Sequence, residues 1–395
     1  MADAPIPLSD AQQRLAALLA PLPQESVSID NALGRYLAAP LIARRAQPPA
    51  DLSAMDGYAL AGDGPSWQLV GESRAGHPYC GKLTSGEAVR ISTGAVVPHG
   101  ADRVLMQENA RRDGADLSCT VPTPDPGTHI RRAGFDFDCG ASLLSAGQAV
   151  SPATIALALT AGHASLDVHR KPRVVIIDGG DELTADPRDC AAHQIPASNG
   201  AMLAAMATPL CVEIARIGPV ADTREALADA FEQAADADLV VTSGGASVGD
   251  HDLIGPTMEA LGAKREFWRV AMKPGKPLMV ARRRSQVLLG LPGNPVSAFV
   301  TGFLFMLPAI RMLMGSARPF PMATPLPLGS AMPAGGPRQE FRRAVWDGHA
   351  LHPVAETDSS ALRALASANA LIDRPIDAPA LAAGAHVPAY LLQNG

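Results

Sequence analysis

The sequence has 395 residues, of which 47% are hydrophobic and 18% are charged, and its formal net charge is −6. A chain of this length is too long for one growing hydrophobic core, so we expect several folded domains and not a disordered protein. The acidic balance excludes the basic surface that nucleic-acid binding requires, so nucleic acid is not an expected partner.

Neither the N-terminus nor the most apolar segment indicates a membrane protein. The segment MADAPIPLSDAQQRL carries Asp3 and lacks the basic-then-apolar pattern of a signal peptide, so we expect a cytoplasmic protein. The apolar stretch from Pro295 to Ile310 is shorter than the roughly 20 residues that span a bilayer, and Pro308 should interrupt it. We interpret this stretch as a buried helix.

The first part of the chain alternates between helical and β-like patterns. A helix is expected within residues 8–44, with Ser9 or Asp10 as its N-cap, and another from Ser151 to Ala164, with Ser151 as N-cap and Pro152 at the first helical position. Between them, short β-like runs are separated by Gly, Pro and Asp turns. These runs are Trp67 to Val70, Ala88 to Ile91 and Arg103 to Met106. We therefore predict a helical linker, residues 1–44 and 142–170, which carries an inserted β-rich domain, residues 45–141.

From Arg170 onward, strand patterns alternate with helix patterns. The order is strand RVVII, helix SNGAMLAAMA, strand CVEIARI, helix TREALADAFEQA and strand DLVV. This alternation predicts a parallel, doubly wound sheet, in which the nearly all-apolar strand VLLGL is covered on both faces. We assign residues 171–316 to this α/β domain. After a Pro-rich link, residues 317–395 are expected to form a C-terminal β domain.

The loop after the strand DLVV has the composition of a phosphate site. Thr242, Ser243, Gly244 and Gly245 stand at the carboxyl end of a strand, where ligands of parallel sheets bind and where glycine lets backbone N–H groups approach phosphate oxygens. An ordinary strand-to-helix turn would also explain the two glycines. The loop alone therefore leaves both interpretations open.

Two later turns could also bind an anion. In Lys273-Pro274-Gly275-Lys276-Pro277 the prolines stiffen the chain and the glycine permits a sharp turn, so two ammonium groups are held close together. The alternative is a solvated surface turn. The segment from Leu291 to Ser297 places a strand end, a tight turn and a helix N-terminus together, and such an N-terminus attracts anions.

Several carboxylates could serve either a metal ion or local structure. Asp250 and Asp252 could hold Mg²⁺ beside a phosphate, or cap the helix that starts near Leu253. Asp222 could likewise be a metal ligand or the cap of the helix that follows it. In the β-rich domain, Asp56 lies in a tight turn and Asp136 lies between two phenylalanines, where an alternating strand with Asp136 facing solvent would explain it.

Eight short motifs follow one another between residues 53 and 298. They are SAMDGYA, STGA, IRRAG, GDEL, SNG, TSGGASVGDHD, MKPGKP and LPGNPVSA. In this order they resemble the molybdopterin molybdenumtransferase family, to which the gephyrin E domain belongs. The resemblance implies a doubly wound molybdopterin-binding α/β domain, a helical segment carrying a β-rich insertion, and a C-terminal β-barrel domain.

The resemblance also implies an activity and an assembly. The implied reaction inserts molybdate into adenylylated molybdopterin and releases AMP, with Mg²⁺ or another divalent ion assisting. The family forms elongated homodimers with the active site in a cleft between subunits, so a homodimer is expected. A separate molybdopterin adenylyltransferase becomes a candidate partner.

Residues at matching positions take candidate roles from the family. Asp222 and Asp252 would hold the divalent ion, while Lys273, Lys276, Asp56 and Glu182 become the candidate catalytic residues. Arg338 and Ser360 would close the pocket from the C-terminal domain, and Asp56, Thr93 and Asp136 would face the cleft from the partner subunit. The candidate binding residues are Thr242, Ser243, Gly244, Gly245, Ser247, Pro292, Asn294, Ser297, Arg338, Ser360, Thr93 and Asp136.

The chain departs from the family pattern near these sites. Asp178-Gly179 stands where a hydroxyl-bearing pair normally precedes the Gly-Asp-Glu-Leu motif, so a carboxylate is added beside an anion site; Ala197 replaces a usual acidic or polar residue. Because the candidate lysines and carboxylates are retained, we predict retained activity. The alternatives are a diverged paralogue that binds molybdopterin without turnover, a molybdopterin adenylyltransferase, and a scaffold without enzymatic activity.

Overall fold

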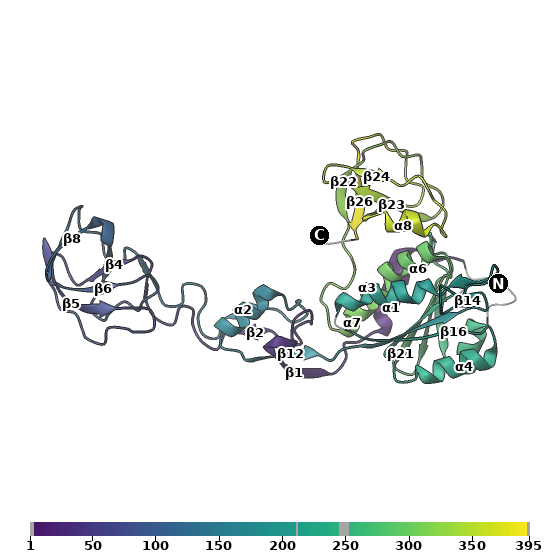
Figure 1. The fold of residues 1–395 in the computed structure, drawn as a ribbon, viewed down its shortest axis with the longest axis horizontal. Helices are drawn as coiled ribbons and strands as arrows, with labels where there is room; N and C mark the ends of the chain where they lie inside the picture. Colours follow the sequence, from purple (N-terminus) through teal and green to yellow (C-terminus); the bar gives the residue numbers. More distant parts are fainter. Residues whose placement is uncertain (1–3, 211, 245–252, 393–395) are drawn as a thin grey trace.

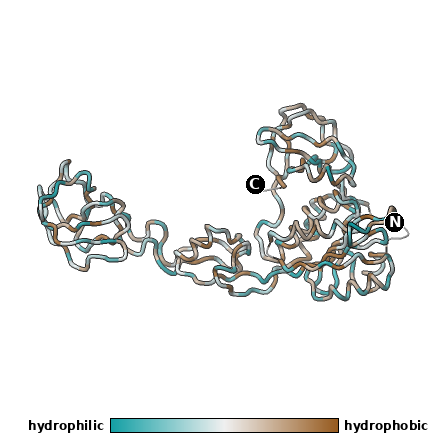
Figure 2. The backbone as a smooth tube through the Cα atoms, viewed as in Figure 1, coloured by the Kyte–Doolittle hydropathy of each residue, from teal (hydrophilic) through white to brown (hydrophobic). Residues whose placement is uncertain are grey.

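The computed structural model describes residues 4–210, 212–244 and 253–392. The chain is elongated, with a β-rich module at one end, a small linker in the middle, and an α/β domain at the other end beside the C-terminal β domain (Figure 1). Apolar segments are concentrated in the strands and helices of the α/β domain (Figure 2). The multidomain α/β fold class expected from the sequence is confirmed.

The inserted module is built on a six-stranded sheet. Its strands, in spatial order, are β7 (Arg103–Met106), β4 (Gly57–Leu60), β6 (Glu87–Ile91), β5 (Ser66–Ser73), β9 (Asp116–Cys119) and β8 (Ala110–Asp113). The three runs predicted from the sequence are β5, β6 and β7. A short antiparallel pair, β3 (Leu52–Ser53) with β10 (Ile130–Arg131), lies outside this sheet. The apolar side chains of alternate strand residues, Trp67 and Leu117 among them, form its core.

The linker consists of one helix and two short antiparallel pairs. These pairs are β1 (Gln24–Ser28) with β12 (Ser165–His169) and β2 (Leu41–Ile42) with β11 (Ser142–Leu144). Helix α2 (Pro152–Thr160) begins as predicted, because the Ser151 hydroxyl accepts a hydrogen bond from the Thr154 N–H at 3.1 Å and Pro152 occupies the first turn.

Helix α1 (Leu8–Leu18) differs from the prediction in its start and in its packing. It begins after Pro7, so Ser9 and Asp10 lie in the first turn and neither is the N-cap. Its apolar face, which includes Leu8 and Leu15, packs into the core of the α/β domain and not with the linker to which we had assigned it. Periodicity identifies the apolar face of a helix, but it does not say which domain covers that face.

The central sheet of the α/β domain is mixed, although the sequence predicted a parallel one. Its order is β16 (Glu213–Val220), β13 (Arg173–Gly179), β17 (Leu239–Ser243), β21 (Gln286–Leu291), β20 (Met279–Arg283) and β18 (Lys264–Trp268). The first four strands are parallel, whereas β20 and β18 are antiparallel to their neighbours. Only Arg284 and Ser285 separate β20 from β21, and a two-residue connection can join only antiparallel strands.

Helices cover both faces of this sheet, as a doubly wound fold requires. The helices α1, α3 (Ser198–Ala207), α6 (Pro295–Thr301) and α7 (Leu307–Leu313) form one core, and α4 (Arg224–Gln233) with α5 (Ile254–Ala260) forms the other. Strand β21 is buried along its whole length between them. This matches the apolar sequence VLLGL.

The long apolar helix continues through Pro308, which we had expected to interrupt it. By length and composition Pro295–Leu313 could cross a membrane, but 78% of it is buried inside the protein. The turn before Pro308, Gly302–Met306, is a π-helix. The wider π-type turn accommodates a proline that lacks an N–H and whose ring would crowd the preceding turn.

The C-terminal strands close into a small barrel. The strands β22 (Thr324–Pro327), β26 (His386–Leu391), β25 (Ala370–Arg374), β23 (Gln339–Trp346) and β24 (Leu351–Pro353) follow one another, and a bridge from Leu328 to Leu351 joins the last to the first. Apolar side chains from alternate positions fill the interior. One further strand, β19 (Met272–Lys273), comes from the α/β domain and pairs with β23.

Candidate functional site

A cleft of about 1150 Å³ lies at the carboxyl edge of the parallel strands, between the α/β domain and the C-terminal domain. The residues after β13, β16, β17 and β21 all line it, as expected for a doubly wound sheet. Eleven of the sequence-predicted site residues meet here. They are Glu182, Asp222, Ser243, Gly244, Lys273, Lys276, Pro292, Asn294, Ser297, Arg338 and Ser360.

The lysine turn is held against both domains. Gly275 has a φ of +104°, and a Cβ atom there would lie 2.6 Å from the Thr301 side chain, so only glycine allows the turn to pack on helix α6. Lys273 lies in β19, and its Nζ is 3.4 Å from Oε1 of Glu340. The turn therefore lines the cleft, with Gly275 buried and the side chains of Lys273 and Lys276 exposed to solvent.

The turn after β21 carries the start of helix α6 into the cleft. Asn294 precedes Pro295, but its amide does not cap the helix; its Nδ2 donates instead to the Ser359 hydroxyl at 2.9 Å. The Val296 N–H donates to the Ser359 carbonyl at 3.0 Å. The C-terminal domain thus binds one of the helix N–H groups that were expected to be free for an anion. Ser297 is buried beside them.

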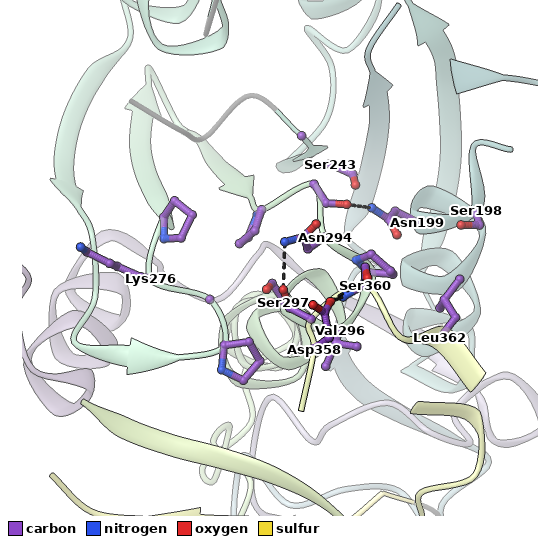
Figure 3. A pocket seen from close by; sticks show the side chains of 18 of the residues that line it. Ser198, Asn199, Ser243, Lys276, Asn294, Val296, Ser297, Asp358, Ser360 and Leu362 are labelled. Carbon is purple, nitrogen blue, oxygen red and sulfur yellow. Dashed lines mark hydrogen bonds between the residues drawn. The ribbon is translucent and has the colours of Figure 1, made fainter. Parts of the chain in front are cut away.

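Helix α3 supports the same turn from the other side. The Nδ2 of Asn199 donates to the Gly293 carbonyl at 2.6 Å. Figure 3 shows Asn199 and Ser198 on one side of the cleft and Lys276 on the opposite side. Asn199 belongs to the SNG motif, and the structure gives it a positioning contact that its place in the sequence did not suggest.

Asp178 is not the isolated negative charge that the sequence suggested. Its buried carboxylate accepts a hydrogen bond from the Gly200 N–H at 2.8 Å and pairs with the Arg216 guanidinium at 3.1 Å. Burial raises the pKa of Asp178, while Arg216 and the Gly200 N–H act in the opposite direction. A Cβ atom on residue 200 would lie 2.1 Å from the carboxylate, so the glycine permits this approach.

Arg343 organises the loop that brings Ser359 and Ser360 to the cleft, and sequence reasoning missed it. Its buried guanidinium donates to the carbonyls of Glu356, Asp358 and Ala361 at 2.6, 3.0 and 3.1 Å. A signal was present in the sequence: with a period of two along β23, Arg343 shares the buried face with Phe341. A charged residue on such a face needs hydrogen-bonding partners.

The acidic side of the cleft contains Asp222. The interpretation of Asp222 as a helix cap is wrong. Thr223 is the N-cap of α4, and the Thr223 hydroxyl accepts a hydrogen bond from the Ala226 N–H at 3.2 Å. Burial raises the pKa of Asp222, and the nearby charges of Asp181 and Glu182 add to the increase. Such crowding of carboxylates favours a bound cation.

The other candidate site residues do not line the cleft of their own chain. Asp56 and Thr93 lie together in the distant β module, where the Asp56 carboxylate accepts from the Thr93 N–H at 2.7 Å and its hydroxyl at 3.1 Å; these bonds lower the pKa of Asp56. Asp136 is exposed, as the solvent-facing interpretation expected, but outside a regular strand. Thr242 is buried within β17. Gly245, Ser247, Asp250 and Asp252 lie outside the described residues.

Known proteins resemble this chain along its length. Three family models match: the MoeA N-terminal region (domain I and II) over residues 6–162, the probable molybdopterin binding domain over 175–312, and the MoeA C-terminal region (domain IV) over 325–392. The solved molybdopterin biosynthesis MoeA protein from Pyrococcus horikoshii is 27% identical, with a TM-score of 0.83 over 99% of this chain and 100% of that one.

Curated proteins similar to this chain are named molybdopterin molybdenumtransferases. Molybdopterin molybdenumtransferase 2 of Mycobacterium tuberculosis is 35% identical over 92% of this chain and 94% of its own length. The molybdopterin molybdenumtransferase of Bacillus subtilis is 33% identical over 94% and 90%, respectively. The fold, the cleft and these relatives together show that the chain belongs to the molybdopterin molybdenumtransferase family.

Proposed function

We propose that this protein inserts molybdate into adenylylated molybdopterin and releases AMP, a step of molybdenum cofactor biosynthesis. The observation that carries the proposal is that Lys273, Lys276 and, from the other domain, Arg338 all line one cleft. Cationic side chains beside strand-end loops suit a tetrahedral dianion and a phosphate. The curated relatives bear the name of this transferase.

The residues of the cleft would act mainly by binding and orienting the two substrates. Lys273, Lys276 and Arg338 would gather molybdate, with the hydroxyls of Ser297 and Ser360 available as hydrogen-bond partners. The strand-end loops would hold the phosphate linkage. Positioning an oxygen nucleophile against that linkage, in a cleft that stabilises negative charge, can supply much of the rate enhancement without a covalent intermediate.

A divalent ion such as Mg²⁺ would bind at Asp222. Among the described residues no group of three or more His, Cys, Asp or Glu side chains is placed to form a complete metal site. The carboxylates crowded around Asp222 nevertheless fit an ion that takes its remaining ligands from substrate phosphates and water, as Mg²⁺ commonly does. When bound, the ion would neutralise charge on the phosphate linkage. Asp252 stays a candidate second ligand.

The predicted homodimer would give Asp56, Thr93 and Asp136 a place in the reaction. Asp56 and Thr93 adjoin strands β4 and β6 of the β module, which lies at the opposite end of the molecule from the α/β domain (Figure 1). Asp136 lies nearer the linker, because the next residue, Phe137, packs against Ala43 and Ala161. All three would serve the cleft of a partner subunit. A separate molybdopterin adenylyltransferase would supply the adenylylated substrate. Both enzymes would work in the cytoplasm.

Reconstitution from purified components tests the proposal. The full chain should release AMP and form molybdenum cofactor when adenylylated molybdopterin, molybdate and Mg²⁺ are supplied. Lys276→Ala is the control, and product no higher than with this variant would favour the non-catalytic paralogue or the scaffold. ATP-dependent adenylylation of molybdopterin by the chain would instead identify an adenylyltransferase.

A further inference from the structure

Glu340 stands at the seam between the two domains that form the cleft. Strand β19 of the α/β domain pairs with β23 of the barrel so that Lys273 lies opposite Glu340. The Gln339 N–H fixes this pairing by donating to the Ala271 carbonyl at 2.9 Å. The strand pairing therefore places a carboxylate of one domain beside a lysine of the other, within the anion-binding cleft.

Cations surround Glu340 on several sides. Its oxygens are 3.4 Å from Nζ of Lys273 and 3.8 Å from Nη1 of Arg342, and Lys273 and Arg342 also line the cleft. On the next strand, Arg374 lies opposite Glu340 in register. Burial lowers the pKa of Arg374, and the charge of Glu340 opposes that lowering. One carboxylate thus pairs with two cationic side chains, Lys273 and Arg342, whereas the Arg374 guanidinium donates to the carbonyls of Pro333 and Pro379.

The contacts to Lys273 and Arg342 are loose. Strong ionic hydrogen bonds between nitrogen and carboxylate oxygen measure about 2.7–2.9 Å, and both distances here are longer. Half of the Lys273 side chain is exposed, whereas only 15% of the Glu340 side chain is. Lys273 can therefore turn toward an incoming anion, while Glu340 stays fixed in its strand.

We infer that Glu340 is the counter-ion of Lys273 and Arg342 while the cleft is empty. It keeps both cations at the cleft until an oxyanion substrate replaces it as their ionic partner. This inference rests on the proposed function, since it concerns the same anion pocket. Glu340 competes with the substrate for the two cations, so it lowers the affinity for a dianion while keeping the cations oriented. Removing its charge while keeping its shape should therefore tighten anion binding.

Titration calorimetry with molybdate on the purified full chain tests the inference. Glu340→Gln keeps the size and an acceptor oxygen, and it should bind molybdate roughly twofold to fivefold more tightly than the original chain, the upper part of the range expected for partly exposed ion pairs. Glu340→Asp withdraws the carboxylate by one methylene group and should give an intermediate gain. If Glu340→Gln does not fold, Glu340→Asp decides alone.

A double-mutant cycle separates competition for Lys273 from a general change in the cleft. In a Lys273→Met background, Glu340→Gln should gain less affinity than in the original chain, because Arg342 is then the one remaining cation of the pair for which Glu340 competes. Equal or weaker binding by a folded Glu340→Gln variant, or the same gain without Lys273, would overturn the inference. Absence of saturable molybdate binding in all of these proteins would instead count against the proposed function.

Discussion

Replacing Arg343 by alanine should release the loop that carries Ser359 and Ser360 into the cleft. The guanidinium donates to three backbone carbonyls, those of Glu356, Asp358 and Ala361. Hydrogen bonds from a charged donor contribute about 1.5–3 kcal/mol each. Water can reach part of the freed loop, because Glu356 and Asp358 are exposed. We therefore expect a local loss of about 3 kcal/mol in total, below the sum of the three bonds, because water solvates the freed carbonyls.

Hydrogen exchange measures this loss where it occurs, which matters because a multidomain chain need not unfold in one step. A loss of about 3 kcal/mol corresponds to exchange roughly 150-fold faster for the amides between 354 and 362. The Val296 amide should also lose protection, since it donates to the Ser359 carbonyl. Arg363→Ala removes an exposed arginine from the following helix and should change little. Unchanged exchange in Arg343→Ala would refute the reasoning.

Three further variants probe other contacts. Asn199→Ala removes the bond to the Gly293 carbonyl and should weaken molybdate binding about fivefold in calorimetry, the equivalent of about 1 kcal/mol; unchanged affinity would contradict its positioning role. Asp178→Asn tests a pH dependence: burial raises the pKa of Asp178, so the folded chain holds this proton more tightly than the unfolded chain. Denaturation should show the original chain gaining stability relative to Asp178→Asn as pH falls through that raised pKa, and the opposite trend would be inconsistent with a raised pKa. Ser151→Ala removes a cap and should cost the linker about 1 kcal/mol, detectable as faster amide exchange in helix α2.

Local patterns were sufficient to predict much of the fold. The alternation of apolar strands with capped helices is encoded within short segments, so β13, α3, α4 and β17 appear where the sequence placed them. The direction of β20 and the packing partner of α1 were not predicted. The direction of β20 depends on the short turn at Arg284. The packing partner of α1 depends on which apolar surface remains uncovered in three dimensions.

In the candidate site, too, local motifs could be predicted from the sequence, whereas contacts set by the tertiary structure could not. Lys273, Lys276 and Ser297 could be proposed because their motifs are contiguous and carry suitable groups. Glu340 could not be proposed, because its importance arises from the register between β19 and β23. For Arg343, only its place on a buried strand face could be read from the sequence, and the loop that it holds was not evident. Such residues act by positioning others. Their side-chain types are ordinary, and only the fold brings them to the cleft.

Asp178 and Ala197 show how two apparent defects in the sequence become one compensated arrangement. Ala197 precedes helix α3 and has no oxygen with which to cap it. The Gly200 N–H, which an N-cap side chain would ordinarily bind, is bound instead by the Asp178 carboxylate from the end of β13. Arg216 offsets the added charge. Because the carboxylate is occupied by a helix N-terminus and a guanidinium, it does not oppose an anion in the cleft as an unpaired charge would.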